Sequence, residues 1–201
     1  SINHEAGVNA LYPPFDPLSI KQKALSILSH GSSAQLGPMN LLFTRGSSEG
    51  IDLCLRACLS EGSGSAVYAY PTFPMYEYWA RISGIRTQRF ALEGNYSEVL
   101  PVEKMRDCGA TLAFICNPNS PTGIPFSVSE VVSFVSQFPG IVVVDEAYVD
   151  FCSSYSLLSK LHELPNALVL RSFSKSWGLA GARLGCILGD ERLIAALRVL
   201  Q

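Results

Sequence analysis

The sequence predicts an α/β fold, a three-layer sandwich in which helices cover both faces of a mostly parallel central sheet. Seven short and mostly apolar runs have the length of strands, and segments with helical periodicity separate several of them. Nearly continuous apolar strands are typical of parallel sheets that are buried on both faces. Ligands bind such sheets at the carboxyl ends of the strands, so the residues after each strand are the candidates for a functional site.

The expected strands and helices alternate along the chain. Strands are expected at residues 41–44, 66–70, 86–90, 111–115, 141–145, 167–171 and 184–188. The clearest helix covers residues 128–138, where five apolar side chains share one helical face. These five are Val128, Val131, Val132, Val135 and Phe138. Weaker helical patterns cover residues 21–28, 51–59 and 76–82.

The composition favours one globular domain. The chain has 201 residues, of which 48% are hydrophobic and 16% are charged, and this suffices for the core of a domain of ordinary size. The formal net charge of -2 gives no electrostatic reason to expect nucleic acid or an anionic membrane as a partner. Residues 1–17 are predicted to form an N-terminal arm, and residues 18–201 the folded domain.

The cysteines favour reduced thiols over a disulfide framework, because they are scattered among apolar runs without a C-x-x-C pair. They are Cys54, Cys58, Cys108, Cys116, Cys152 and Cys186. No histidine lies near Cys54 and Cys58 at metal-ligand spacing, so no metal site is expected. The amino terminus shows no export signal, and a cytoplasmic location is the default prediction.

The segment after the first strand is suited to bind phosphate. Gly46, Ser47 and Ser48 open a helix, and such small residues leave backbone N–H groups uncovered at its N-terminus. Two other interpretations stay open. A serine can simply cap the helix, or Gly46-x-Ser48-x-Gly50 can be the nucleophile elbow of an α/β-hydrolase.

Two further strand ends supply an aromatic ring and a polar turn. Phe73 follows the strand at residues 66–70 and can stack on a flat ligand, although such a residue is more often part of the core. The turn at residues 116–123 puts the amide of Asn119 and the hydroxyl of Ser120 on the crevice side. Loops of this composition are usually only turns.

A carboxylate and an amine follow the next two strands. Asp145 ends an apolar strand, where a partly desolvated carboxylate requires a cation or a strong donor beside it, and Tyr148 adds a phenol. Ser172, Ser174 and Lys175 follow the strand at residues 167–171. A lysine among small and apolar neighbours can act as a nucleophilic amine, and the alternative is a side chain that extends into solvent.

Together these strand ends supply what pyridoxal phosphate requires. The requirements are an amine, an anion for the ring nitrogen, a donor to the ring oxygen, a stacking ring and a phosphate cradle. Five segments then resemble the large domain of the fold-type I pyridoxal-phosphate-dependent aminotransferases of class I/II, and most of all the histidinol-phosphate aminotransferases. The segments are TRGSSEGID at 44–52, YPTFPMY at 70–76, CNPNSPTG at 116–123, VDEAYVDF at 144–151 and LRSFSKSWGLAGARLG at 170–185.

The resemblance implies a role for each candidate residue. Lys175 would bind the cofactor covalently and move a proton, Asp145 would pair with the ring nitrogen, and Tyr148 would donate to the ring oxygen. Phe73 takes the position of the stacking aromatic. The residues implied as phosphate ligands are Gly46, Ser47, Ser48, Ser172, Ser174 and Arg183.

The sequence departs from the family pattern in three places. Ser120 stands where the family usually has an asparagine that bonds the ring oxygen, so Ser120, or Asn119 or Asn117 nearby, must serve. Tyr12 resembles the arm tyrosine that touches substrate, without the usual residues before it. Family members continue into a small C-terminal domain, so residues up to Gln201 are expected to be the large-domain portion.

The implied function is transamination between an amino acid or amine and a 2-oxo acid, namely histidinol phosphate with 2-oxoglutarate, by a homodimer. One alternative is a lyase of the same fold, such as threonine-phosphate decarboxylase, because the cofactor contacts do not fix which bond breaks. A second is a non-catalytic domain that keeps the fold. A remote third is a hydrolase using Ser48, which would need His162, the only histidine after Asp145, although its surroundings predict a surface helix.

Overall fold

Seven strands form one sheet in the order β1-β7-β6-β5-β4-β2-β3. The computed structural model describes residues 17–29, 35–59, 62–94 and 99–201. The strands are β1 Leu41–Thr44, β2 Ser65–Tyr70, β3 Arg86–Ala91, β4 Leu112–Cys116, β5 Ile141–Asp145, β6 Ala167–Ser172 and β7 Gly185–Gly189. Strand β7 runs antiparallel to both of its neighbours, β1 and β6, and the other pairs of strands in this sheet are parallel. The predicted mostly parallel sheet is confirmed, with each strand within one residue of its expected bounds.

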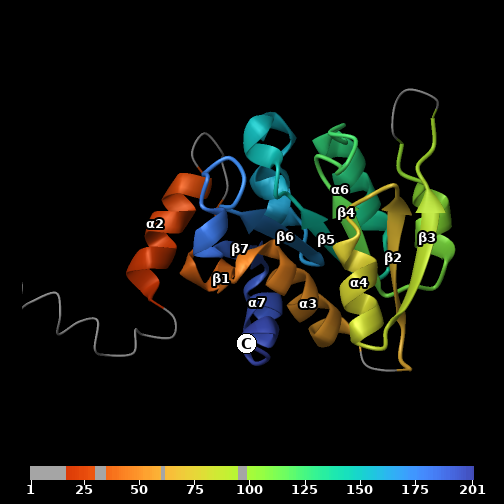
Figure 1. The fold of residues 1–201 in the computed structure, drawn as a ribbon, viewed down its shortest axis with the longest axis horizontal. Coiled ribbons are helices and arrows are strands. Elements are labelled where there is room, and N and C mark those ends of the chain that lie inside the picture. The colour runs from red at the N-terminus through yellow and green to blue at the C-terminus, as the bar shows by residue number, and fades with distance from the viewer. Residues whose placement is uncertain (1–16, 30–34, 60–61, 95–98) are drawn as a thin grey trace, which may run out of the picture.

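Helices cover both faces of the sheet, which confirms the three-layer sandwich (Figure 1). The α-helices are α2 Leu18–Leu28, α3 Gly46–Cys58, α4 Met75–Ile82, α5 Val102–Asp107, α6 Val128–Gln137 and α7 Glu191–Arg198. Short 3-10 helices span Pro38–Asn40, Val149–Phe151, Ser153–Tyr155, Leu157–Glu163 and Ala180–Ala182. Buried side chains of α2, α5 and α6 pack on one face, and those of α3, α4 and α7 pack on the other.

The alternation of side chains along β5 and β6 decides which way the functional groups point. Val143 packs on the face covered by α3 and α4, so Asp145, two residues on, continues on that face. Leu170 packs on the same face, and Ser172 continues its row. Arg171 therefore points to the opposite face, toward α2 and α6.

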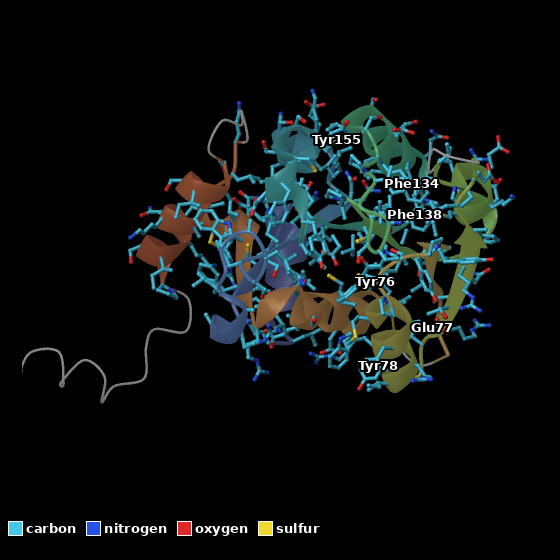
Figure 2. The ribbon with its side chains drawn as sticks, turned by 45° about the horizontal axis from the view of Figure 1, so that its top comes forward. Tyr76, Glu77, Tyr78, Phe134, Phe138 and Tyr155 are labelled. Atoms are coloured by element: carbon cyan, nitrogen blue, oxygen red, sulfur yellow. The ribbon has the colours of Figure 1, made fainter. Side chains whose placement is uncertain are left out.

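Helix α6 shows how local sequence fixes an element. Ser127 Oγ accepts a hydrogen bond from the Glu130 N–H (3.2 Å), and Glu130 Oε2 accepts one from the Ser127 N–H (2.8 Å). This reciprocal pair satisfies two helix-end donors and explains where the helix begins. Phe134 and Phe138 stack at 5.4 Å between ring centroids and lie on the far side of the sheet from Tyr76 (Figure 2).

Four helices depart from the helical patterns seen in the sequence. Helix α3 begins at Gly46, as the segment after the first strand predicted, and its apolar pattern starts only at residue 51 because the first turn carries no apolar side chain. Helices α5 and α7 were not expected, since they are short and bury few side chains. The surface helix expected around His162 is present as a 3-10 helix, which exposes Lys160 and His162 and buries Leu157, Leu158 and Leu161.

None of the helices in the described part of the chain combines the length and the apolar character that crossing a bilayer requires. All six cysteines are free thiols. Within the described ranges, no group of three or more histidine, cysteine or acidic side chains is arranged to hold a metal ion.

Candidate functional site

The carboxyl ends of β4, β5 and β6 lie side by side. Cys116 pairs with Asp145 across β4 and β5, and Asp145 pairs with Leu170 across β5 and β6. The turn after β4, the segment after β5 and the loop after β6 therefore meet at one edge of the sheet. There the Nζ atom of Lys175 lies 4.9 Å from the centroid of the Tyr148 ring. The structure thus brings together the amine, the phenol and the carboxylate that the sequence singled out.

Asp145 is a buried carboxylate held by neutral donors. Its Oδ1 accepts from the Ala147 N–H (3.1 Å) and its Oδ2 accepts from the Tyr76 hydroxyl (3.1 Å). Burial raises the pKa of Asp145 to about 6, against the opposing effect of these hydrogen bonds and of the Lys175 charge. Among the described residues no cation forms an ion pair with Asp145, so a protonated ring nitrogen suits this carboxylate.

Tyr76 is a site residue that the sequence analysis missed. Its ring is buried and stacks on Phe114 at 4.8 Å, and Phe73 approaches it edge-on at 5.8 Å. Burial, followed by the negative charge of Asp145, raises the pKa of the Tyr76 phenol. The hydroxyl therefore stays protonated and donates to Asp145. Its position in the segment YPTFPMY was a sequence signal for this residue. Only the tertiary structure shows that its hydroxyl bonds Asp145.

The polar turn after β4 is tied to the turn that carries Phe73. Asn119 Nδ2 donates to the Pro71 carbonyl (3.0 Å), and Asn119 Oδ1 accepts from the Thr72 hydroxyl (3.1 Å). The Asn117 amide bonds the backbone of Phe126 in both directions, at 2.8 and 3.2 Å. Both amides therefore hold the turns, and Asn117 is turned toward the protein interior.

Ser120 and Tyr148 line the same cavity, which has a volume of about 410 Å³. Asn119 also lines it, together with Pro118 and Phe151. Of the three polar candidates for the ring oxygen, Ser120 is the half-exposed one, while both asparagines are buried. The cavity therefore favours Ser120 as the residue that faces a ligand.

The register of β7 with its two neighbours brings together the residues predicted to bind phosphate, which form the candidate phosphate cradle. Gly185 pairs with Thr44 of β1 on one side and with Ser172 of β6 on the other. Gly46 follows Thr44 by two residues, and Arg183 precedes Gly185 by two. A Cβ atom on Gly46 would lie 2.8 Å from Arg183 Nη2, and the φ angle of Gly46 is +74°. Only glycine leaves room there for the guanidinium.

Ser47 and Ser48 lie in the first turn of α3, next to Gly46, and are half-buried. The helix cap is Arg45 and its side chain makes no capping hydrogen bond, so the interpretation of a serine as the cap was wrong. Ser172 Oγ accepts from the Ser174 N–H (3.3 Å). Ser172, the last residue of β6, and Ser174 therefore lie together at the end of the strand that borders the candidate cradle.

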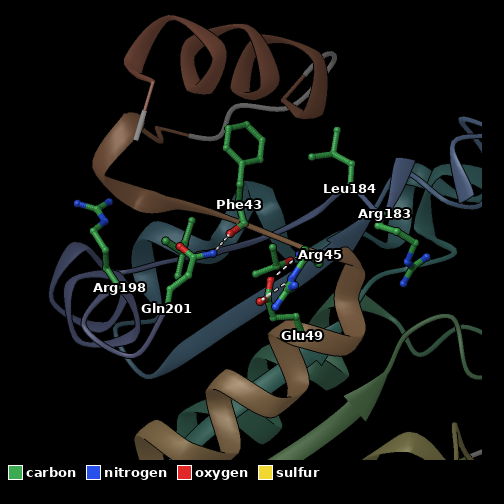
Figure 3. Close-up of a pocket in the computed structure, with 9 residues that line it drawn as sticks. Phe43, Arg45, Glu49, Arg183, Leu184, Arg198 and Gln201 are labelled. Carbon is green, nitrogen blue, oxygen red and sulfur yellow. Dashed lines mark hydrogen bonds and ion pairs between the residues drawn. The ribbon is translucent and has the colours of Figure 1, made fainter. Parts of the chain in front are cut away.

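A second cavity of about 400 Å³ touches the cradle from outside. It is lined by Leu42, Phe43, Thr44, Arg45, Glu49, Arg183, Leu184, Arg198 and Gln201. Figure 3 shows Arg45 paired with Glu49 (3.3 Å) and Gln201 bonded to the Phe43 carbonyl (2.6 Å). Neither Lys175 nor Asp145 lines this cavity, so it is separate from the crevice where the amine and the carboxylate meet.

The geometry opposes the serine-hydrolase interpretation. His162 lines a cavity with Gly189 and Asp190, at the end of β7 far from Gly185. Ser48 lies near the Gly185 end, because α3 follows Thr44 and Gly46 abuts Gly185. A nucleophile and a base at opposite ends of a strand cannot share a proton. Tyr12, the expected substrate contact, lies outside the described residues.

Comparison with known proteins identifies relatives of this chain. The chain is 31% identical to the histidinol-phosphate aminotransferase of Christiangramia forsetii over 199 residues, which are 98% of this chain and 55% of that protein. The histidinol-phosphate aminotransferase of Sinorhizobium meliloti, solved with pyridoxal-5'-phosphate, covers all of this chain with a TM-score of 0.83 at 23% identity; the chain covers 54% of it. The chain spans about half the length of the curated relatives it matches.

A decarboxylase shares the fold as well. The L-threonine-O-3-phosphate decarboxylase of Porphyromonas gingivalis superposes with a TM-score of 0.76 at 20% identity, over 97% of this chain and 59% of that one. Such a likeness shows the fold alone, and it leaves the reaction to be argued from the site. The model of the family described as "Aminotransferase class I and II" matches residues 2–201. This chain belongs to the aminotransferase class I and II family.

Proposed function

We propose that this chain is the cofactor-binding part of an aminotransferase that moves an amino group between an amino acid or amine and a 2-oxo acid. The observation that carries the proposal is the Lys175 amine, 4.9 Å from the Tyr148 ring centroid and beside the buried Asp145 carboxylate. Family membership supports pyridoxal phosphate as the cofactor. When bound, it supplies an aldehyde that condenses with a primary amine, releasing water, and a protonated ring that accepts electrons.

The residues of the site fit the ring nitrogen, the ring oxygen, the ring face and the phosphate of pyridoxal phosphate. Asp145 would hold the proton on the ring nitrogen, since this buried carboxylate has only neutral hydrogen-bond donors among the described residues. Tyr148 and Ser120, on one cavity wall, would donate to the ring oxygen. Phe73 would cover one ring face. The groups proposed for the phosphate are Gly46, Ser47, Ser48, Ser172, Ser174 and Arg183, around the Gly185 junction.

Lys175 would carry the proton that transamination moves. Its side chain is exposed at the open edge of the sheet, so its Nζ atom can reach the carbon beside the substrate amino group. The Tyr148 ring beneath it restrains the ammonium by a cation–π contact. We propose Tyr12 as a substrate contact of the arm.

Histidinol phosphate, with 2-oxoglutarate as acceptor, is the substrate pair that we propose. Its support is the set of relatives named histidinol-phosphate aminotransferase, at 31 to 36% identity over most of this chain. A cytoplasmic homodimer is the proposed form of the enzyme. Neither part of this proposal follows from the geometry of the site.

Chemical trapping tests the site. Reduction with borohydride in the presence of pyridoxal phosphate should attach the cofactor to Lys175, as located by peptide mass spectrometry. Lys175→Ala should abolish the labelling. The matched control is Lys160→Ala, which removes another exposed lysine, paired with Glu163 at 2.8 Å. Labelling that persists in Lys175→Ala would refute the assignment of the amine.

Product analysis then separates the alternatives. An aminotransferase converts the cofactor to pyridoxamine phosphate with histidinol phosphate as donor. A decarboxylase releases carbon dioxide from threonine phosphate, and a domain without turnover traps the cofactor but forms neither product. Either of the last two results would replace the proposed reaction and leave the site assignment standing.

A further inference from the structure

We propose that Asp150 is a positioning residue that holds the loop carrying Lys175 through the two side chains that follow the lysine. The proposal rests on the function proposed above. Asp150 lies in the 3-10 helix Val149–Phe151, two residues after Tyr148. It touches neither the crevice cavity nor the phosphate cradle, so its effect on the reaction passes through Lys175.

The carboxylate of Asp150 accepts hydrogen bonds from three side chains. Ser176 Oγ and Trp177 Nε1 both donate to its Oδ2, the latter at 2.9 Å. Arg171 Nη2 donates to its Oδ1 and forms an ion pair with it. Asp150 therefore links the two residues directly after Lys175 to Arg171 of strand β6, four residues before the lysine.

The fixed end of this link is buried. Arg171 is 5% exposed, and its Nη1 donates to Glu146 Oε2 at 3.4 Å. Glu146 is 1% exposed and also accepts from the Leu157 N–H (2.6 Å) and the Ser156 hydroxyl (2.8 Å). A buried ion pair with these additional donors resists displacement. Because Arg171 also bonds Asp150, it fixes the position of the Asp150 carboxylate.

Besides the contact of Lys175 with the Tyr148 ring and that of Trp177 with the Phe173 ring (5.9 Å), the loop has few restraints. Residues 175–183 are exposed, and the backbone bonds that restrain Lys175 and its neighbours are few. The Gly178 N–H donates to the Lys175 carbonyl (3.0 Å), and the Leu179 N–H donates to the Phe173 carbonyl (3.0 Å). Exposed loops with few buried contacts open readily. Two side-chain bonds to an anchored acceptor therefore restrict where the lysine can lie.

The hydrogen bonds of Asp150 and Arg171 lie on the opposite face of the sheet from Asp145. Arg171 points to the face of the sheet that α2 and α6 cover, whereas Asp145 points to the face of α3 and α4. Trp177, Arg171 and Asp150 line one cavity with Ile27 and Leu28 of α2. Substitutions at Ser176 and Trp177 thus leave Asp145 and Tyr148 in place and act on the position of Lys175.

The experiment uses the double variant Ser176→Ala/Trp177→Phe. It removes both donors from the loop and keeps the Arg171–Asp150 pair, so we expect its thermal midpoint to match that of the wild type. Without cofactor, amide hydrogen exchange of residues 174–178 should become about ten-fold faster. With pyridoxal phosphate, the rate of borohydride-trapped labelling at Lys175 should fall about ten-fold.

The matched control is Ser136→Ala/Trp79→Phe, which makes the same chemical changes elsewhere. Ser136 is exposed on α6, and the Trp79 indole N–H has no hydrogen-bond partner within the described ranges. This variant should keep the wild-type exchange and labelling rates. Wild-type rates in Ser176→Ala/Trp177→Phe would overturn the positioning role, whereas a wild-type protein that cannot be labelled would overturn the proposed function instead.

Discussion

At the scale of single residues, the pairing of Tyr76 with Asp145 is the most informative contact in the site. A buried carboxylate is stable only if its oxygens are bonded, and here a backbone N–H and a phenol supply the bonds. Neither donor carries charge. The carboxylate is thus fixed in direction while its affinity for a cationic ligand is preserved.

Replacing this phenol tests its role. Tyr76→Phe leaves Asp145 Oδ2 without its donor in a buried place, so the free energy of unfolding at neutral pH should fall by about 1–3 kcal/mol. The affinity for pyridoxal phosphate should fall as well, because the carboxylate becomes harder to ionise. Urea unfolding and cofactor titration measure the two effects.

The control is Tyr78→Phe, at an exposed tyrosine of the same helix that is 43% exposed. It should change neither quantity. Equal cofactor affinity in Tyr76→Phe and the wild type would show that the phenol serves stability alone.

At the scale of elements, the reversed strand β7 brings the residues of the proposed phosphate cradle to one edge of the sheet. Because β7 runs against β1 and β6, its amino end lies where theirs carry their carboxyl ends. Arg183 therefore arrives at the same edge as Gly46 and Ser172. Arg183 has a left-handed backbone, with φ of 52°, which is uncommon for a residue other than glycine and is typical of functional sites.

Substitutions at two glycines of β7 distinguish an effect on the stability of the fold from an effect on phosphate binding. A Cβ on Gly185 would lie 2.7–2.9 Å from the backbone of Gly46, and a Cβ on Gly189, at the other end, would lie 2.6 Å from a Leu168 methyl. Gly185→Ala and Gly189→Ala should each destabilise the fold by about 1–3 kcal/mol through overpacking.

Only Gly185→Ala should also reduce the preference for pyridoxal phosphate over pyridoxal, which lacks the phosphate. Paired titrations with the two compounds measure this preference. An unchanged preference in Gly185→Ala would remove the cradle from the cofactor site, and a reduced preference in Gly189→Ala would show that strand distortion spreads along β7.

At the scale of the whole molecule, the site lowers the stability of the cofactor-free fold. The pKa of Asp145 is about 6 in the folded chain and near 3.8 when unfolded. Between these values the folded state binds more protons than the unfolded state, so the free energy of unfolding falls as the pH rises through this window. Above pH 6 this deficit levels off at about 3 kcal/mol.

Asp145→Asn should remove this deficit. Urea unfolding without cofactor should show the variant near wild-type stability at pH 4 and more stable than the wild type at pH 8, while its cofactor affinity falls. Asp107→Asn, at an exposed acid whose pKa the Arg106 hydrogen bond lowers, should keep the wild-type fall between pH 4 and 6. A stability difference between Asp145→Asn and the wild type that does not grow from pH 4 to 8 would contradict the buried ionisation.

Prediction from sequence succeeded where the signal is local. Strand β5 is an apolar run between polar residues, and α6 has both a stripe and a capping box, so both were found within a residue or two. Helix α7 was missed because two buried side chains, Ile194 and Leu197, make too short a pattern. Lys175 and Asp145 were singled out because they lie at or just after the end of a strand, where ligands bind.

Which side chains contact Asp145 and the loop of Lys175 is decided by the tertiary structure. The sequence by itself determined the sheet, the layers and the chemical groups at the strand ends, because burial imposes a period on neighbouring residues. Only the tertiary structure decided that Tyr76 meets Asp145, 69 residues away, and that Ser176 and Trp177 meet Asp150, 26 and 27 residues away. A hydrogen bond between side chains depends on position in space, and contacts across such separations leave no period in the chain.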